Sequence, residues 1–371
     1  MKILHIITGL GIGGAEQQLR MLLPHLPARS DVVTLTHPGP VAVQLREDGV
    51  TVEHLGMRGN RDLRALPRLT RIIANGGYDL VHTHLYRACV YGRPAAYLAR
   101  VPAIATEHSL GSHHMEGRPL NRGNRALYLL TERLGRATVA VSDTVATRLR
   151  EWGVPEQRIH VVPNGIDARR FRYDAARRQR TRARLSVGPD TFLVGAVGRL
   201  VPGKRFDLLL RALAETPGAH LLLVGDGPER LALEKLAAEL GVTDRLHLPG
   251  ACGTDGPEPT VPGLLAAMDV FVSTSREEAF GLAAVEALAA GLPTLHTACP
   301  ALEDLPAHQT EGARRVSSHP TLLARELTRY ITAGATRITP PAAVAHYDIA
   351  RSADRLTHIY DDTLRRTSSR S

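Results

Sequence analysis

The sequence is poor in cysteine, lysine and aromatic residues. Its three cysteines are odd in number and lack CxxC spacing, so neither a disulfide framework nor a zinc knuckle is expected. The opening stretch MKILHIITGL is too short for a membrane span, and it runs into a glycine turn where a signal peptide would need a longer apolar core. These absences favour a protein of the reducing cytoplasm.

The bulk composition is that of a globular protein. Hydrophobic residues make up 43% and charged residues 22%, and 371 residues suffice for two domains. Only three of the 46 basic residues are lysines, a bias that we attribute to a GC-rich, actinobacterial genome. The net charge of +9 suits nucleic acid, an anionic membrane surface or phosphorylated small molecules. Because no basic motif is interleaved with aromatic residues, no nucleic acid partner is expected.

In the first half, short apolar runs alternate with helical patterns, which is typical of βαβ units and a parallel sheet. The predicted strands are 2–7, 31–36, 79–82, 103–107, 138–141 and 160–162. The predicted helices that follow most of them are 64–74, 88–99, 125–134 and 144–151.

The second half repeats this arrangement after an arginine-rich, weakly apolar segment, 167–189, which we interpret as the connection between domains. The predicted strands are 192–197, 220–224, 245–248, 270–273, 294–296 and 314–316, and 347–364 predicts a long helix. We therefore expect an α/β protein with two Rossmann-like, doubly wound parallel-sheet domains facing a central cleft. The expected domains are 1–170, with the helix 347–366 packing back on it, and 185–345.

A glycine-rich loop follows the first predicted strand. Gly9-Leu-Gly11-Ile-Gly13-Gly14 has the spacing GxGxxG between a strand and a helix. A dinucleotide-binding domain also needs an acidic residue about twenty residues further on, but the second strand ends in Leu35-Thr36-His37. A nicotinamide-dependent oxidoreductase is thus disfavoured. A phosphate or sugar against this backbone and a tight turn without a ligand both remain open.

Two cations lie on a glycine-bearing turn in the second half. Arg199 and Lys204 belong to Gly198-Arg-Leu-Val-Pro-Gly203-Lys, between a predicted strand and a helix. Such cations can neutralise a diphosphate and stabilise it as it departs, although surface cations also occur without this role. No Asp-x-Asp motif is present to hold Mg²⁺ for the same task, so we predict chemistry that requires no metal and no other cofactor.

The most specific feature is an acidic pair. Glu278 is predicted in the loop after a strand, and Glu286 lies inside a helix that begins near Gly281. Because the neighbours of Glu286 are apolar, we expect a buried carboxylate that needs partners, which the vicinal hydroxyls of a ribose would supply. Glu278 would accept hydrogen bonds from a sugar, while the amides of Phe280 to Leu282 would face a phosphate.

In this order, the motifs resemble those of GT-B glycosyltransferases of family GT4. They are Gly13-Gly14-Ala15-Glu16, Glu107-His108, Val141-Ser142, Val162-Pro163-Asn164-Gly165-Ile166-Asp167, Gly198-Arg199 with Lys204, Val224-Gly225-Asp226-Gly227-Pro228, and Glu278 with Glu286. The resemblance implies a retaining enzyme that moves a hexose-type unit from a nucleotide sugar, UDP-N-acetylglucosamine or UDP-glucose first, to an acceptor hydroxyl. The acceptor would belong to natural-product or cell-envelope glycan synthesis, and would attack on the face from which the diphosphate leaves.

The resemblance also implies roles for individual residues. Glu286 would hold the ribose, Glu278 the transferred sugar, and Arg199 with Lys204 the diphosphate. His108 would approach the sugar near its reacting face and counts as catalytic with Arg199, Lys204 and Glu278. The other implied donor ligands are Gly13, Gly14, Gly227, Leu248, Gly250, Phe280, Gly281 and Leu282, and the implied acceptor ligands are Glu16, His82, His84, His113 and Asn164.

Two further patterns have more than one interpretation. A set of six potential metal ligands suggests a zinc site, a substrate-lining surface or exposed loop histidines. It comprises His82, His84, His108, His113, His114 and Glu116. A series of arginines beside leucines predicts an ordinary surface helix or a basic face for anionic lipid. These are Arg118, Arg122, Arg125, Arg133 and Arg136. An epimerase of the same architecture, a transferase with a lipid acceptor and a non-catalytic basic module remain as alternative functions.

Overall fold

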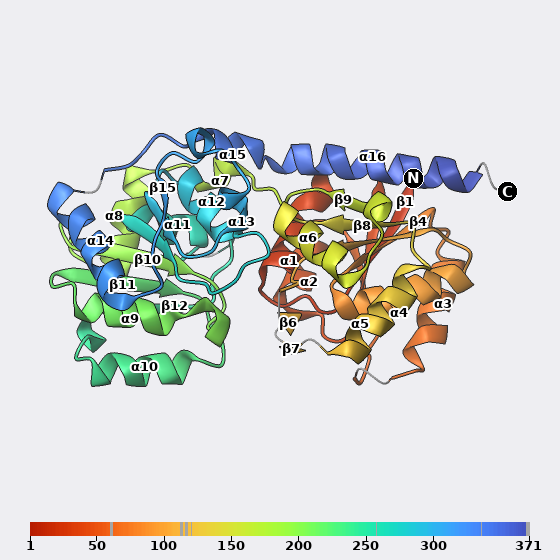
Figure 1. Cartoon of the computed structure of the whole chain (residues 1–371), viewed down its shortest axis with the longest axis horizontal. Helices are drawn as coiled ribbons and strands as arrows, with labels where there is room; N and C mark the ends of the chain where they lie inside the picture. Colours follow the sequence, from red (N-terminus) through yellow and green to blue (C-terminus); the bar gives the residue numbers. More distant parts are fainter. Residues whose placement is uncertain are drawn as a thin grey trace. The chain divides into compact units, whose positions relative to one another are not determined.

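The computed structural model of the chain divides into two α/β units (Figure 1). Unit 1 contains Met1–Gly165 and Ile349–Ser371, and unit 2 contains Ile166–Asp348. The structure describes residues 1–368 except 60–61, 112–113, 116–117, 120, 257 and 335. Each unit has its own parallel sheet and its own apolar core.

Unit 1 is built on a seven-stranded sheet of order β3-β2-β1-β4-β5-β8-β9, in which all neighbours are parallel. The strands are β1 (Lys2–Ile7), β2 (Arg29–Thr34), β3 (Thr51–His54), β4 (Leu80–His84), β5 (Ala103–Glu107), β8 (Ala137–Ala140) and β9 (Ile159–Val161). A separate antiparallel pair consists of β6 (His114–Met115) and β7 (Arg118–Pro119). The order of the large sheet reverses between β1 and β4, and ligands of such sheets bind at the carboxyl ends of the strands at this point.

Helices cover both faces of the unit 1 sheet. One face packs against α1 (Gly14–Leu22), α2 (Gly39–Glu47) and α16 (Ile349–Ser368), and the other against α3 (Ala65–Asn75) and α4 (Tyr86–Leu98). The remaining helices are α5 (Arg122–Glu132), which packs on α4, and α6 (Asp143–Trp152), beside β8 and β9. Although α16 ends the described chain, it belongs to unit 1 (Figure 1). It supplies Leu356 and Tyr360 to the same core as Ile3 and Ile7 of β1.

Unit 2 has a six-stranded parallel sheet of order β12-β11-β10-β13-β14-β15. The strands are β10 (Phe192–Val197), β11 (Ala219–Val224), β12 (Leu246–Gly250), β13 (Val270–Ser273), β14 (Thr294–His296) and β15 (Ala313–Arg315). The helices are α7 (Ala168–Phe171), α8 (Ala175–Arg184), α9 (Phe206–Ala214), α10 (Arg230–Glu239), α11 (Val261–Ala267), α12 (Leu282–Ala289), α13 (Pro300–Glu303), α14 (Pro320–Ala333) and α15 (Ala342–His346). The order reverses between β10 and β13, as it does between β1 and β4 in unit 1.

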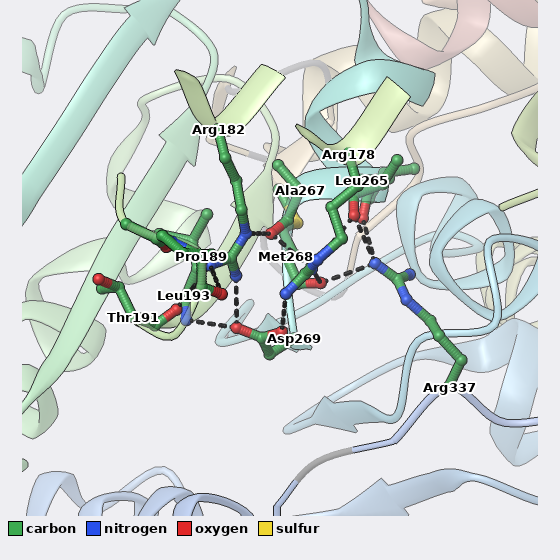
Figure 2. Close-up of polar contacts among 12 residues, drawn as sticks. Arg178, Arg182, Pro189, Thr191, Leu193, Leu265, Ala267, Met268, Asp269 and Arg337 are labelled. Atoms are coloured by element: carbon green, nitrogen blue, oxygen red, sulfur yellow. Dashed lines mark hydrogen bonds and ion pairs between the residues drawn. The ribbon is translucent and has the colours of Figure 1, made fainter. Parts of the chain in front are cut away.

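The segment 167–189, interpreted from its sequence as a connection, instead holds two helices of unit 2, α7 and α8. Arginines rather than apolar residues anchor α8. Arg182 is 3% exposed, donates to the carbonyl oxygen of Ala267 at 2.9 Å and pairs with Asp269 at 2.7 Å, and Arg178 pairs with the other oxygen of Asp269 at 2.6 Å (Figure 2). A pattern based on apolar spacing misses a helix of this kind.

The sequence pattern also did not predict β3. Its exposure alternates little, because Val52 is its one buried residue. No described helix combines the length and apolar character needed to cross a bilayer.

Candidate functional site

Two loops meet at the strand-order reversal in unit 2. One follows β10 and carries Gly198 to Lys204, and the other follows β13 and carries Thr274 to Gly281. They are tied together because Thr274 Oγ1 donates to the carbonyl oxygen of Lys204 at 2.8 Å, and the Arg276 amide donates to that of Gly203 at 2.9 Å. The sequence-predicted cations and Glu278 therefore lie on neighbouring, connected loops.

A lysine–carboxylate pair spans the two loops. Lys204 Nζ donates to Glu278 Oε1, which also accepts a hydrogen bond from Ser275 Oγ at 2.6 Å. The Lys204 and Glu278 side chains are 28% and 16% exposed, so salt weakens the attraction in this partly buried pair less than in an exposed one. Sequence reasoning did not single out Ser275, although it stands three residues before Glu278. Arg199 is exposed, and within the described part of the chain its guanidinium has no ion-pair or hydrogen-bond partner.

Glu286 lies on α12 and is buried, as its apolar neighbours in the sequence predict. The residue is 9% exposed, and burial raises the pKa of its carboxyl group to about 7. Among the described residues, none forms a hydrogen bond or ion pair with this carboxyl group. Its oxygen atoms are not among the fully enclosed unpaired atoms of the described residues, so a donor from outside the protein can reach them. α12 begins after Gly281, whose φ of 105° is in the left-handed region and which no side chain caps.

Glycines allow three loops of unit 2 to approach closely. A side chain on Gly225 would place its Cβ 1.9 Å from the carbonyl oxygen of Gly198, and one on Gly227 would lie 2.4 Å from that of Leu200. The Gly225 amide donates to the carbonyl oxygen of Gly250 at 2.8 Å, which brings the end of β12 to the same place. Packing thus explains why Gly225 and Gly227 are glycine. The roles of Gly227, Leu248 and Gly250 as donor ligands stay predictions.

In unit 1, the loop after β1 leads into α1. Gly13 is its N-cap residue, with extended backbone and no side-chain cap, and the Glu16 carboxylate lies where a side chain on Gly13 would be. Gly14 is exposed, and Glu16 is the acidic residue of the first turn. The amino end of a helix favours anions, and the predicted roles of Gly13, Gly14 and Glu16 stay predictions.

Four histidines come together at the strand-order reversal of unit 1. His5 of β1 and His82 of β4 are register partners, His84 ends β4, and His108 follows β5. His5 Nδ1 lies 3.1 Å from His84 Nε2, and His84 Nδ1 lies 3.2 Å from His108 Nε2. His82 contacts the Tyr360 hydroxyl and Thr106 Oγ1, each at 2.7 Å. Burial lowers the pKa of all four rings, to about 3 for His5 and about 4 for His108.

This placement refines the predicted acceptor ligands. His82 is fully buried and His84 is 1% exposed, so both lie beneath the surface rather than on it. His84, His108 and Asn164 line a cavity of about 20 Å³, together with Gln18 and Ser352. A cavity of this size holds about one water molecule. The predicted ligand His113 and also Glu116 lie outside the described residues, and so does the side chain of His114.

The sequence did not single out His5, although a polar residue among the apolar neighbours of a first strand is a readable signal. Ring nitrogens of His5, His82 and His84 all lie within 4.8 Å of one another, close enough to hold a metal ion. Both nitrogens of His82 already have hydrogen-bond partners. Within the described part of the chain, these three histidines form the one group of side chains close enough to hold a metal ion, and this group contains no carboxylate.

Comparison with known proteins identifies the family. The model described as Glycosyltransferase Family 4 matches residues 12–170, and the model described as Glycosyl transferases group 1 matches residues 177–338. The chain is 30% identical over 351 residues to D-inositol 3-phosphate glycosyltransferase 1 of Catenulispora acidiphila, covering 84% of this chain and 81% of that protein. The chain belongs to glycosyltransferase family 4. The predicted family and enzyme class are confirmed.

Other relatives of this family 4 glycosyltransferase agree. It is 30% identical over 316 residues to a 2-deoxystreptamine glucosyltransferase of Streptomyces kanamyceticus, with 79% of each chain covered. The crystal structure of Anabaena HepE in complex with UDP-glucose has a TM-score of 0.85 at 24% identity, and covers 98% of this chain and 100% of that chain. The last likeness, with the two parallel sheets, confirms the predicted GT-B fold.

Proposed function

We propose that this glycosyltransferase moves a hexose-type unit from a UDP-sugar, UDP-N-acetylglucosamine or UDP-glucose, to an acceptor hydroxyl with retention of anomeric configuration. The observation that carries the proposal is the set of two cations and two carboxylates on the loops that follow β10 and β13 and on α12. These are Arg199, Lys204, Glu278 and Glu286. The complex of HepE with UDP-glucose supports a UDP donor.

In this proposal each group of unit 2 has one task. The ribose hydroxyls donate to the Glu286 carboxylate, which has no partner among the described residues. Arg199 and Lys204 bind the diphosphate, and Glu278 accepts from hydroxyls of the transferred sugar. Lys204 is paired with Glu278 in the absence of a ligand. Donor binding would replace this ion pair by a contact of Lys204 with the diphosphate and a contact of Glu278 with the sugar. The ion pair keeps both side chains ordered before the donor arrives.

The proposed chemistry depends on the leaving group. The anomeric carbon–oxygen bond to the diphosphate breaks while the acceptor oxygen bonds to the same face, and the acceptor proton passes to the departing diphosphate. Negative charge grows on the diphosphate as the bond breaks, and fixed cations stabilise that charge most in the transition state. We assign this task to Arg199 and Lys204, without a metal ion and without a carboxylate nucleophile.

The acceptor is proposed to be a small molecule or a glycan of the cell envelope. Two relatives are named for D-inositol 3-phosphate and for 2-deoxystreptamine, which supports an acceptor rich in polar ring substituents. In unit 1, Glu16 and Asn164 are the proposed acceptor ligands, because Asn164 lines the cavity beside His108.

A donor panel tests the function. The full chain is incubated with UDP-, GDP- and ADP-sugars without acceptor, and nucleotide release is measured with and without EDTA. We expect slow release from one UDP-sugar, unchanged by EDTA and faster with an acceptor, and an α-linked product from an α-linked donor by NMR. Release that requires a divalent ion would contradict the metal-free proposal. Oxidation of NADH, or epimerisation of the donor without transfer, would replace the function altogether.

One observation favours a second candidate, a lipid-linked acceptor at a membrane surface. On α5, Leu127 and Leu130 are 43% and 62% exposed, and Arg122 and Arg133 are exposed near them in sequence. An apolar and basic helix face suits an anionic bilayer. Cosedimentation with phosphatidylglycerol vesicles but not phosphatidylcholine vesicles, lost in Leu130→Asp, would support this candidate, and no binding to either would remove it.

A further inference from the structure

Threonine hydroxyl groups fix the main chain at Lys204 and at Ser275, shortly before Glu278. Thr297, which follows β14, donates from Oγ1 to the carbonyl oxygen of Ser275 at 2.6 Å. Thr274 Oγ1 donates to the carbonyl oxygen of Lys204 at 2.8 Å. Thr274 and Ser275 are both buried. Buried polar groups that have their partners hold one arrangement, so the main chain of both loops is fixed at this point.

Two donors of different kinds meet at one oxygen atom of Glu278. Ser275 Oγ donates to Oε1 at 2.6 Å, and Lys204 Nζ donates to the same atom. The Ser275 side chain is short and 2% exposed, whereas Lys204 has a flexible four-carbon stem that is partly exposed. Lys204 can therefore leave Oε1 by rotation of its stem. If Ser275 left it, a buried hydroxyl group would lose its acceptor, which costs free energy.

Binding of the donor would affect these two contacts differently. In the proposed function Lys204 turns to the diphosphate, with which it forms charge-assisted hydrogen bonds. Of the two donors to Glu278 Oε1, Ser275 then remains. A carboxyl group that is held in one orientation before binding loses less side-chain freedom when it accepts from the sugar. The Ser275 hydroxyl would thus strengthen the hold on the sugar through Glu278.

We propose that Ser275 is a positioning residue that keeps Glu278 turned towards the transferred sugar once Lys204 has moved to the diphosphate. The inference rests on the proposed function for the roles of Lys204 and Glu278. A serine hydroxyl has one proton to donate, and that of Ser275 goes to Glu278 Oε1, so the residue acts through this carboxylate. Thr297 in turn fixes the main chain from which the hydroxyl projects.

The first experiment compares two ligands by calorimetry on the full chain, UDP alone and an unreactive analogue of the UDP-sugar that the donor panel selects. Ser275→Ala removes the hydroxyl and keeps the main-chain carbonyl group that Thr297 contacts. Loss of one oriented hydrogen bond should weaken binding of the analogue about tenfold. Binding of UDP should not change, because UDP lacks the transferred sugar that Glu278 holds.

The matched control is Thr294→Val, which removes another buried hydroxyl group of unit 2. Thr294 Oγ1 donates to the carbonyl oxygen of Leu292 at 3.1 Å, and its loss should leave the affinity for both ligands unchanged. A second variant, Ser275→Cys, keeps the size of the side chain but donates weakly, so its affinity for the analogue should lie between those of Ser275→Ala and the native chain.

Two results of this comparison would overturn the inference. An unchanged affinity for the analogue in Ser275→Ala would show that the hydroxyl does not support sugar binding. Equal weakening of UDP and of the analogue would show that the hydroxyl only stabilises the loop.

A double-mutant cycle shows whether Ser275 acts through Glu278. Ser275→Ala, Glu278→Ala and the double variant are compared with the native chain by initial rates of transfer, and by affinity for the analogue, which requires no turnover. Ser275→Ala should lower kcat/KM about tenfold in the native chain and have no further effect in Glu278→Ala. The same decrease in both backgrounds would contradict the proposed role.

Unfolding in urea reports on the contact without a substrate. The separate effects of Ser275→Ala and Glu278→Ala on the unfolding midpoint should sum to more than the effect of the double variant, because both remove the same hydrogen bond. Strictly additive effects would refute the contact and the inference with it.

The failure of the inference and the failure of the proposed function have different signatures. If the two substitutions are coupled in unfolding but neither UDP nor any nucleotide sugar binds, the proposed function is wrong and the sugar is not the ligand of Glu278, although the contact with Ser275 stands. If the chain transfers a sugar and Ser275→Ala behaves like Thr294→Val, the proposed function stands and the inference is wrong.

Discussion

Glu286 should make donor binding depend on pH. Folding raises the pKa of this carboxyl group to about 7, so it is protonated below pH 7 and ionised above it. Ribose hydroxyls donate to the ionised form, and donor affinity should therefore rise as pH increases through 7. We expect binding about tenfold weaker at pH 6 than at pH 8, measured by calorimetry with an unreactive UDP-sugar analogue.

The matched variant for this prediction is Glu286→Gln, which keeps the shape but cannot ionise. Its affinity should be low and nearly constant over the same pH range. The stability of the fold should change with pH in the opposite direction to the donor affinity. Because the folded state holds this proton more tightly than the unfolded chain, the contribution of Glu286 to stability is lost as pH rises through 7. A native chain whose donor affinity falls with rising pH would contradict the assignment.

Arg199 should act on the rate more than on the fold. Its side chain is exposed and has no partner among the described residues, so Arg199→Ala removes no internal contact that the structure records. Loss of one group that stabilises transition-state charge costs about 10²–10³ in kcat. We expect that decrease with a change in KM of less than tenfold, from initial rates of nucleotide release.

The exposed Arg325 of α14 provides the control for charge. Arg325→Ala removes one positive charge from the same unit and should leave kcat unchanged. Similar rates for both variants and the native chain would show that Arg199 is an ordinary surface cation. The sequence predicts some features of these residues and not others. The apolar neighbours of Glu286 predict its burial. The pair of Lys204 and Glu278 joins residues 74 positions apart, and no local pattern could predict it.

At the scale of elements, Arg182 of α8 is expected to hold unit 2 together. Its guanidinium donates to four backbone carbonyl groups, those of Ala267, Gly188, Pro189 and Thr191, and pairs with Asp269 (Figure 2). Removing one partner from a buried charge pair typically costs about 3–5 kcal/mol. We expect a loss of that size in Arg182→Ala, measured as faster amide hydrogen exchange in β10 and β13 at moderate urea.

The neighbouring Arg180 is exposed on the same helix, and Arg180→Ala should change stability by less than about 0.5 kcal/mol. Equal effects of the two variants would mean that α8 contributes little to unit 2. The same helix shows where sequence reasoning stops. Strands with continuous apolar runs, such as β10 and β13, could be predicted to the residue, but α8 is held by arginine hydrogen bonds that leave no apolar spacing.

At the scale of the whole molecule, unit 1 is formed by two separate segments of the chain. Unit 1 takes its last helix, α16, from beyond the end of unit 2, so the chain crosses between units twice. The sequence pattern predicted a helix near this position, because its apolar residues recur at helical spacing. The residues of β1 that share a core with α16 lie more than 300 positions earlier, and only the sheet topology brings them together.

This arrangement predicts that a substitution near the carboxyl end destabilises the part of the chain that begins it. Leu356 is 2% exposed in the core of unit 1 beside residues of β1 and α1, and replacing a buried leucine by alanine costs about 2–5 kcal/mol. In Leu356→Ala, hydrogen exchange followed by mass spectrometry should be faster in β1, β4 and β5 and unchanged in β10 and β13. The exposed Arg355→Ala, one residue away on α16, should alter neither group of strands. If the strands of both units exchanged faster to the same extent in Leu356→Ala, the two cores would unfold as one cooperative body, because the cost of a cavity in unit 1 would then be shared by unit 2.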